Sequence, residues 1–182
     1  MKRAPFFRLL VALLIPAFAY AIESQEIDWL ELLPPEDLAA LEKLPETNEQ
    51  DLLGEGPFCG EGAIKLEGQP AVLSSARTVA AMNNRLVRLS GYPIPLEGDG
   101  EGRFQRFLLV SYPGACAQLP APAPNQMVLV TYPTGIALDD VYLPLWVDGT
   151  LKASKTVTEL GETAYSLEAS QVRLVEEAEL EN

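Results

Sequence analysis

Residues 86–97 read LVRLSGYPIPLE, and this stretch predicts the strand around which the rest of the fold is arranged. Val87 and Leu89 fall on one face of an extended chain and Arg88 falls on the other, a period of two that is typical of a β-strand. Gly91 in the middle suits a bulge or a bend. We therefore expect a strand with a bulge or a bend at its glycine.

Turn and strand signals continue along the chain. The run EGDGEG at residues 97–102 predicts a hairpin turn, which explains its alternating acids better than a calcium loop, because such a loop would be longer. Four further segments have the apolar character of strands, and the second is apolar throughout, as in the centre of a sheet. They are residues 104–112, 127–132, 145–154 and 165–175, the last with a possible break at Ala169.

Five short strands with little helix predict a mainly β domain. The runs VRLSGY, WVDGTL and LEASQVRL resemble the strand signatures of OB-fold domains. That resemblance implies a long first strand that bends at a glycine and is shared by both halves of the barrel. We therefore expect a five-stranded OB-like barrel with an N-terminal helical and linker extension, and a small β-sandwich is the alternative fold.

The region before the barrel is predicted to hold a helix and a linker. Pro35 suits a helix start, and leucines recur at helical spacing from there to Leu44. This apolar stripe is narrow, so the helix needs a surface to pack on, and Trp29 is a candidate anchor. Residues 46–70 are rich in glycine, proline and acids, as linkers are, and residues 74–83 are predicted to form a short helix.

The first 21 residues have the features of a secretory signal. Basic residues precede an apolar run that is too short for a comfortable membrane span, and Ala19-Tyr20-Ala21 fits the small-residue rule for cleavage. We expect cleavage after Ala21 and a periplasmic protein that is not integral to the membrane; an uncleaved anchor is the alternative. The predicted organisation is a signal peptide at 1–21, an acidic extension and linker at 22–70, an OB-like domain at 71–176 and an acidic tail at 177–182.

The mature chain would be strongly acidic, with 10 basic against 26 acidic residues. The acids concentrate at the two ends, and residues 69–175 are close to neutral. Nucleic acids and anionic lipids both need a positive footprint, so neither is expected as a partner. A basic protein partner or loosely held cations fit this charge, and solvated acidic tails also explain it.

The absence of histidine limits the chemistry of the chain. It removes the usual proton shuttle and the Ser-His-Asp and Cys-His arrangements, and no base stands near Cys116 in the sequence to activate its thiol. We therefore expect a protein that is not an enzyme and has no cofactor. Export permits a disulfide between Cys59 and Cys116, and a buried Cys116 with a free Cys59 is the alternative.

Residues 112–126, YPGACAQLPAPAPNQ, form a candidate binding segment. Alternating prolines hold the backbone extended, so that it loses little entropy on docking, and the amide pair at the end can lock the return into the next strand. The segment is interpreted either as a rigid crossover or as a preformed docking edge. The candidate partner-binding residues are Trp29, Tyr112, Pro120, Pro122, Pro124, Asn125 and Gln126.

Several runs together resemble a bacterial family of small exported proteins, a domain of unknown function. They are EIDWLELLP at 26–34, GYPIPLE at 91–97, FLLVSYPGAC at 107–116, PAPAPNQ at 120–126 and WVDGTL at 146–151. The resemblance covers residues 26–35 and 85–175. It implies a non-enzymatic accessory or binding protein of the bacterial envelope, linked to an ABC-type transport or assembly system, with an envelope protein as its partner.

Metal handling in the periplasm is the alternative function, with Cys116 and carboxylates as ligands. Relatives in the resembled family usually carry histidine two positions after the cysteine, whereas this chain has Gln118. A lone thiolate beside amides is a poor ligand set for zinc or copper. No metal site is therefore expected, with Cys116 as a weak candidate, and an enzyme of unknown reaction is a third hypothesis.

Overall fold

The computed structural model describes residues 23–44, 70–115 and 122–179. The predicted signal peptide and nearly all of the predicted linker lie outside these residues. In chain order, with η for a short 3-10 helix, the elements are β1 (Gln25–Glu26), η1 (Trp29–Leu32), α1 (Pro35–Leu41), η3 (Ala71–Ser74), η4 (Ala80–Met82), β2 (Arg85–Gly98), β3 (Arg103–Val110), η6 (Pro124–Gln126), β4 (Met127–Ala137), β5 (Leu145–Thr158), β6 (Gly161–Leu174) and η7 (Glu177–Glu179).

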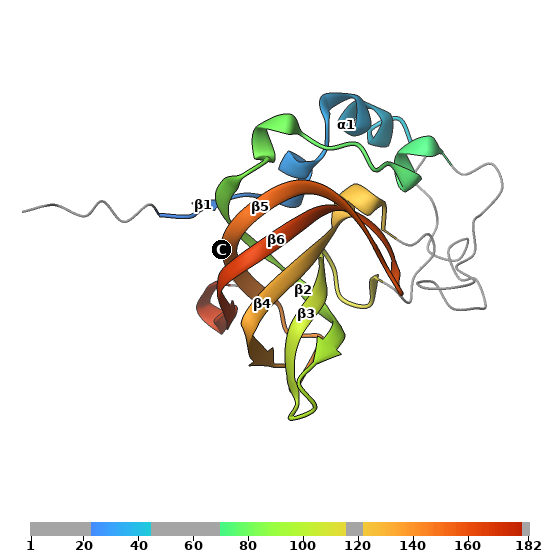
Figure 1. Ribbon diagram of the computed structural model, residues 1–182. Helices are drawn as coiled ribbons and strands as arrows, with labels where there is room; N and C mark the ends of the chain where they lie inside the picture. The colour runs from blue at the N-terminus through green and yellow to red at the C-terminus, as the bar shows by residue number, and fades with distance from the viewer. Residues whose placement is uncertain (1–22, 45–69, 116–121, 180–182) are drawn as a thin grey trace, which may run out of the picture.

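Five long strands close into a barrel in the order β2-β3-β4-β6-β5, and β2 pairs again with β5. Neighbours are antiparallel except β4 and β6, which run parallel. The mainly β, five-stranded barrel predicted from the sequence is confirmed, and the alternative of two packed sheets is not what forms. In Figure 1 the β2–β3 hairpin lies at one end of the barrel, while α1 lies over the other end.

The first long strand, β2, is shared by both halves of the barrel, as expected. Its residues up to Gly91 pair with β5, and its residues from Tyr92 onward pair with β3. A Cβ atom at Gly91 would stand 2.6 Å from the Val110 carbonyl oxygen, so the close crossing requires glycine.

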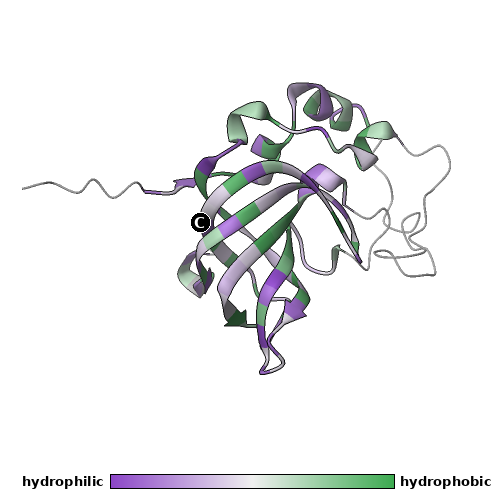
Figure 2. Ribbon diagram, viewed as in Figure 1, coloured by the Kyte–Doolittle hydropathy of each residue, from purple (hydrophilic) through white to green (hydrophobic). Residues whose placement is uncertain are grey.

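The end of β3 and the start of β4 are buried on both faces. Phe107 and Leu109 belong to the larger hydrophobic cluster inside the barrel, and Leu108 and Val110 belong to a second cluster. The start of β4 alternates between the same two clusters, which explains why its sequence is apolar throughout. Full burial of each such side chain stabilises the fold by roughly 1.5–3 kcal/mol. On β5 and β6, by contrast, hydrophobic and hydrophilic residues alternate (Figure 2).

The N-terminal extension contributes to the core. Ile27 and Leu32 are buried in the larger cluster, and the buried Tyr165 hydroxyl of β6 donates to the Leu32 carbonyl oxygen at 2.9 Å. The predicted helix is confirmed as α1, but it ends at Leu41, and Leu44 closes a following turn instead. The extension therefore packs as part of the barrel domain.

The helix predicted over residues 74–83 is wrong. Two short 3-10 helices, η3 and η4, flank an extended stretch. The reason lies in distant partners: Ser75 donates to Asp37 at 2.7 Å, and the Val79 N–H donates to the Tyr165 hydroxyl at 2.6 Å. A helix over these residues would move the Ser75 hydroxyl and the Val79 N–H away from their partners. Tertiary contacts therefore outweigh local helix propensity here.

The predicted turn at residues 97–102 is confirmed, and its central acid has a local use. Asp99 Oδ1 accepts hydrogen bonds from the N–H groups of Glu101 and Arg103, at 2.8 and 3.2 Å. Gly100 and Gly102 adopt positive φ. The Asp99 carboxylate thus holds its own turn, as an Asx-type side chain does.

Candidate functional site

Two adjoining hollows on the barrel share Tyr92 as a common wall. The first, the tryptophan pocket, has a volume of about 230 Å³ and is lined by Trp29, Ser90, Gly91, Tyr92, Ser111, Pro144, Trp146, Val175 and Glu179. The second, the Tyr92 groove, has a volume of about 280 Å³ and is lined by Tyr92, Pro93, Ile94, Pro95, Val110, Gly114, Val141 and Tyr142.

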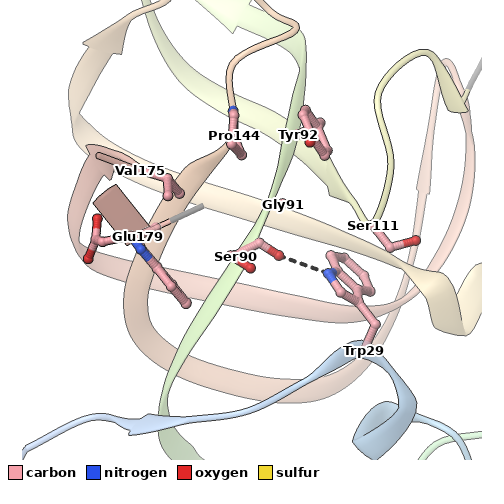
Figure 3. A pocket seen from close by; sticks show the side chains of 9 residues that line it. Trp29, Ser90, Gly91, Tyr92, Ser111, Pro144, Val175 and Glu179 are labelled. Carbon is pink, nitrogen blue, oxygen red and sulfur yellow. Dashed lines mark hydrogen bonds between the residues drawn. The ribbon is translucent and has the colours of Figure 1, made fainter. Parts of the chain in front are cut away.

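A capped turn holds Trp29 against β2. Asp28 Oδ1 accepts from the Leu30 N–H, and Glu31 accepts in return from the Asp28 N–H, so that η1 begins with a capping box. The Trp29 indole N–H donates to the Ser90 carbonyl oxygen at 2.8 Å (Figure 3). Because residue 91 is glycine, the indole ring can lie directly against the strand.

Trp146 forms another wall, and charged residues of neighbouring strands surround it. The Arg88 guanidinium lies 6.0 Å from the centroid of the Trp146 ring, and Arg88 Nε donates to Asp148 at 2.9 Å. The Trp146 indole N–H is buried and makes no hydrogen bond within the described residues.

Glu179 stands at the rim of the tryptophan pocket. Each of its oxygens accepts from Arg173 at 2.8 Å, and Oε2 also accepts from the Glu176 N–H at 2.8 Å. The Arg173 hydrogen bond is the main cause that lowers the pKa of Glu179 to about 2, and the Trp146 side chain adds a smaller lowering. The sequence predicted an acidic tail over residues 177–182; Glu179 in that stretch is exposed, and it pairs with Arg173 of β6.

Exposed hydrophobic residues of the β4–β5 loop form one side of the Tyr92 groove. Tyr142 is 67% exposed, Val141 is 37% exposed, and Leu143 beside them is also exposed. Asp140 fixes the loop, because its carboxylate accepts from the Tyr142 N–H at 2.8 Å. Large apolar side chains gathered on one ordered loop beside a groove are typical of an interaction surface.

The unmatched charges around the two hollows are negative. Asp139 and Asp140 lie on the β4–β5 loop, and Glu176 follows the backbone bond between Val175 and Pro144. None of the three takes part in an ion pair within the described ranges, whereas Arg173 is matched by Glu179. A cationic ligand or partner therefore suits this surface.

The family model of DUF3299, described as a protein of unknown function, matches residues 29–174. The chain belongs to the DUF3299 family. The crystal structure of a DUF3299 family protein from Pseudomonas aeruginosa PAO1 is 26% identical, with a TM-score of 0.58, and the match covers 85% of this chain and 97% of that chain. No curated protein matches the chain. The resemblance to a family of unknown function is thus confirmed, and the matched residues include both tryptophans and the whole Tyr92 groove.

The structure places the predicted docking residues of this DUF3299 protein in different environments. Trp29 lines the tryptophan pocket. Tyr112 packs half-buried against the second hydrophobic cluster, and burial raises the pKa of its hydroxyl. Pro122 and Pro124 are half-buried, and Pro120 lies outside the described residues. The described end of the proline-rich segment, residues 122–126, is therefore partly packed against the domain.

Asn125 and Gln126 perform the locking that the sequence predicted. The Asn125 amide donates to the Arg77 carbonyl oxygen and to Asp37, both at 3.0 Å, and the Gln126 amide donates to the Trp29 carbonyl oxygen at 3.1 Å. Asn125 is 0% exposed, so its side chain is used inside the fold. Gln126 instead holds the backbone of Trp29, which forms a wall of the tryptophan pocket.

Sequence reasoning missed the residues that shape the two hollows beside Trp29. Trp146 was read only as part of a strand signature, and Tyr142 was not singled out. An exposed aromatic in a short acidic loop was the available signal for Tyr142. Nothing in the local sequence indicates that Trp146 lies beside Glu179.

Cys59 and Cys116 lie outside the described residues, so their disulfide and the weak metal candidacy of Cys116 stay predictions. Within residues 23–44, 70–115 and 122–179, no three cysteine or carboxylate side chains come together as ligands for a metal ion. No helix in the same ranges has the length and apolar character of a membrane span.

Proposed function

We propose that this DUF3299 protein is a non-enzymatic recognition module of the bacterial envelope that binds a protein partner through the Tyr92 groove. The observation that carries the proposal is the exposed pair Val141 and Tyr142 beside an apolar hollow of about 280 Å³. Aromatic residues are enriched at the energetic centres of protein interfaces. Scattered exposed hydrophobics need no explanation, but a groove with an aromatic rim does.

The proposed occupant is an extended segment of the partner that carries apolar side chains with lysine or arginine beside them. The unmatched acids Asp139, Asp140 and Glu176 favour such a basic segment and disfavour an acidic one. The groove floor includes Pro93 and Pro95, which offer no N–H group to an added strand. We therefore expect recognition through side chains rather than through strand addition.

The rest of the proposal is supported by the sequence and the fold. The signal-like N-terminus supports an envelope location, and the lack of histidine supports a binding role over catalysis. A first strand that pairs twice and a parallel β4–β6 pair agree with an OB-like barrel, whose outer surface and loops commonly bind ligands. The link to an ABC-type transport or assembly system is a hypothesis that follows from the family resemblance alone.

Crosslinking pull-down from the envelope with matched variants tests the groove. Tyr142→Ala removes the exposed ring, whereas Val157→Ala removes an exposed side chain on β5 that does not line either hollow. We expect Tyr142→Ala to reduce recovery of the specific partner by about tenfold or more, as loss of an interface hot spot does, and Val157→Ala to retain it. Both variants should keep the wild-type melting temperature. Equal recovery by the two variants, or no specific partner with the wild type, would refute the proposal.

A further inference from the structure

We infer that the tryptophan pocket is the specificity site of this recognition module and that it receives a single arginine side chain of the partner. The inference rests on the proposed function, because the pocket and the Tyr92 groove share Tyr92 as a wall. One extended segment can thus lie in the groove and insert a neighbouring side chain into the pocket.

The size of the pocket favours a side chain over a free small molecule. Its volume of about 230 Å³ lies below the roughly 300–1,000 Å³ that is usual for ligand and cofactor sites. One long side chain fits a hollow of this size, and its attachment to a larger interface supplies the remaining binding energy. A pocket that accepts one anchor residue is the usual arrangement at an interface centre.

The walls suit a flat cation with an apolar stem. Trp29, Trp146 and Tyr92 provide aromatic surface, and Pro144 and Val175 provide aliphatic surface. A guanidinium stacks on indole rings more readily than a lysine ammonium, and its stem packs against apolar walls. Arg88, which already lies 6.0 Å from the Trp146 ring centroid, is an intramolecular example of the same contact.

Hydrogen-bond acceptors remain available for the guanidinium. Glu179 Oε1 accepts one hydrogen bond, from Arg173, and a carboxylate oxygen can accept a second. Ser90 and Ser111 also line the pocket, and neither hydroxyl group makes a hydrogen bond to another described residue. These oxygens match the several N–H donors of an arginine head group.

The arginines of the protein itself do not make the site positive. Arg88 is matched by Asp148 and Arg173 by Glu179, at 2.9 and 2.8 Å. Glu176 makes no close ion pair within the described residues, although its charge acts on Arg173, and it adds a further negative charge beside the rim. A further cation is therefore favoured, whereas an anion would meet Glu179 directly.

Tryptophan fluorescence tests the inference directly, because the chain has only two tryptophans and both line the pocket. The mature protein is titrated with N-acetylarginine amide and with N-acetylcitrulline amide, a neutral molecule of nearly the same shape. We expect a saturable change of emission with both ligands. The dissociation constant should be about fivefold or more lower for the arginine compound, and its binding should weaken with added salt. Tyr142→Ala, which alters only the groove, should leave this titration unchanged.

Two variants and a matched control complete the test. Glu179→Gln and Trp29→Ala should each reduce the preference for arginine over citrulline, with Trp146 as the remaining reporter in Trp29→Ala. Glu168→Gln removes the acid of another pair, Lys152–Glu168, and should bind like the wild type. Equal binding of arginine and citrulline, no saturation, or wild-type binding by Trp29→Ala would overturn the inference. Any of these results beside a positive pull-down would reject the pocket and leave the groove.

Discussion

Replacing Asp37 by alanine should destabilise this DUF3299 protein far more than replacing its ionic partner Arg77. Asp37 is 0% exposed, although it lies in the first turn of α1. Its Oδ2 accepts from the Ser75 hydroxyl at 2.7 Å and from the Asn125 amide at 3.0 Å, and its Oδ1 pairs with Arg77. One carboxylate thus joins α1, the extended stretch before η4 and the return into β4.

The magnitude follows from which donors are buried. A hydrogen bond to a charged group contributes roughly 1.5–3 kcal/mol, and removal of Asp37 leaves two buried donors without their acceptor. Breaking a buried charged network in this way costs about 3–5 kcal/mol. The Arg77 side chain is 55% exposed, so its ion pair is worth about 0–1 kcal/mol and Arg77→Ala should be mild. For a domain of this size, 1 kcal/mol shifts the melting temperature by roughly 2–4 °C, so Asp37→Ala should lower it by about 6–20 °C.

Urea and thermal unfolding of residues 22–182, followed by circular dichroism, measure this difference. Glu36→Ala is the matched control, because Glu36 is an exposed acid in the same helical turn. We expect Glu36→Ala and Arg77→Ala to unfold close to the wild type. If Asp37→Ala shifts the midpoint no more than Arg77→Ala does, the buried network does not hold the N-terminal extension to the barrel, and the reasoning fails.

Three further predictions concern the titration of Asp37, the close crossing at Gly91 and the Tyr165 hydroxyl. Burial alone would raise the pKa of Asp37, but hydrogen bonds from Ser75, Arg77 and Asn125 outweigh it and lower the pKa from 3.8. The stabilisation by the ionised carboxylate is therefore present above pH 3.8 and is lost as the pH falls below it. Urea midpoints at about pH 6 and pH 3 should therefore differ more in the wild type than in Asp37→Asn. Gly91→Ala should lower the free energy of unfolding by about 1–3 kcal/mol, because its Cβ would meet the Val110 carbonyl oxygen at 2.6 Å. A variant of wild-type stability with unchanged Trp29 emission would contradict this expected clash. Tyr165→Phe leaves the buried Leu32 carbonyl oxygen and the part-buried Val79 N–H without their partner, so it should lower the free energy of unfolding by about 1–3 kcal/mol and speed amide exchange at Val79.

The barrel could be predicted because its information is local. The alternation around Val87 and the glycine at 91 reflect a strand with one buried face that must cross closely over its neighbour. The uniform apolar start of β4 reflects burial on two faces. These are properties of a strand and its nearest surroundings, and a sequence pattern reports them directly.

The failures share the opposite cause. Residues 75–79 have no local reason to be extended, since their conformation is set by Asp37 and by Tyr165. Asp37 had a sufficient local explanation as an acid at a helix start, which hid its buried role. The pairing of Glu179 with Arg173 could not be foreseen either, because no local pattern shows that the two residues face each other. In each case the deciding partner lies on another element.

The candidate site shows how the two kinds of information combine. Residues 112–126 stood out as a docking edge, yet the described end of that segment acts behind the site: Gln126 binds the Trp29 carbonyl oxygen, and Asn125 binds Asp37. Trp29 is thereby held from two sides, by its own capped turn and by the return into β4. Substitutions at Gln126 would therefore change binding at the tryptophan pocket without any contact between Gln126 and the partner. A loss of binding in such a variant would identify a positioning residue, and only variants of pocket-lining residues such as Trp29 and Glu179 report on recognition itself.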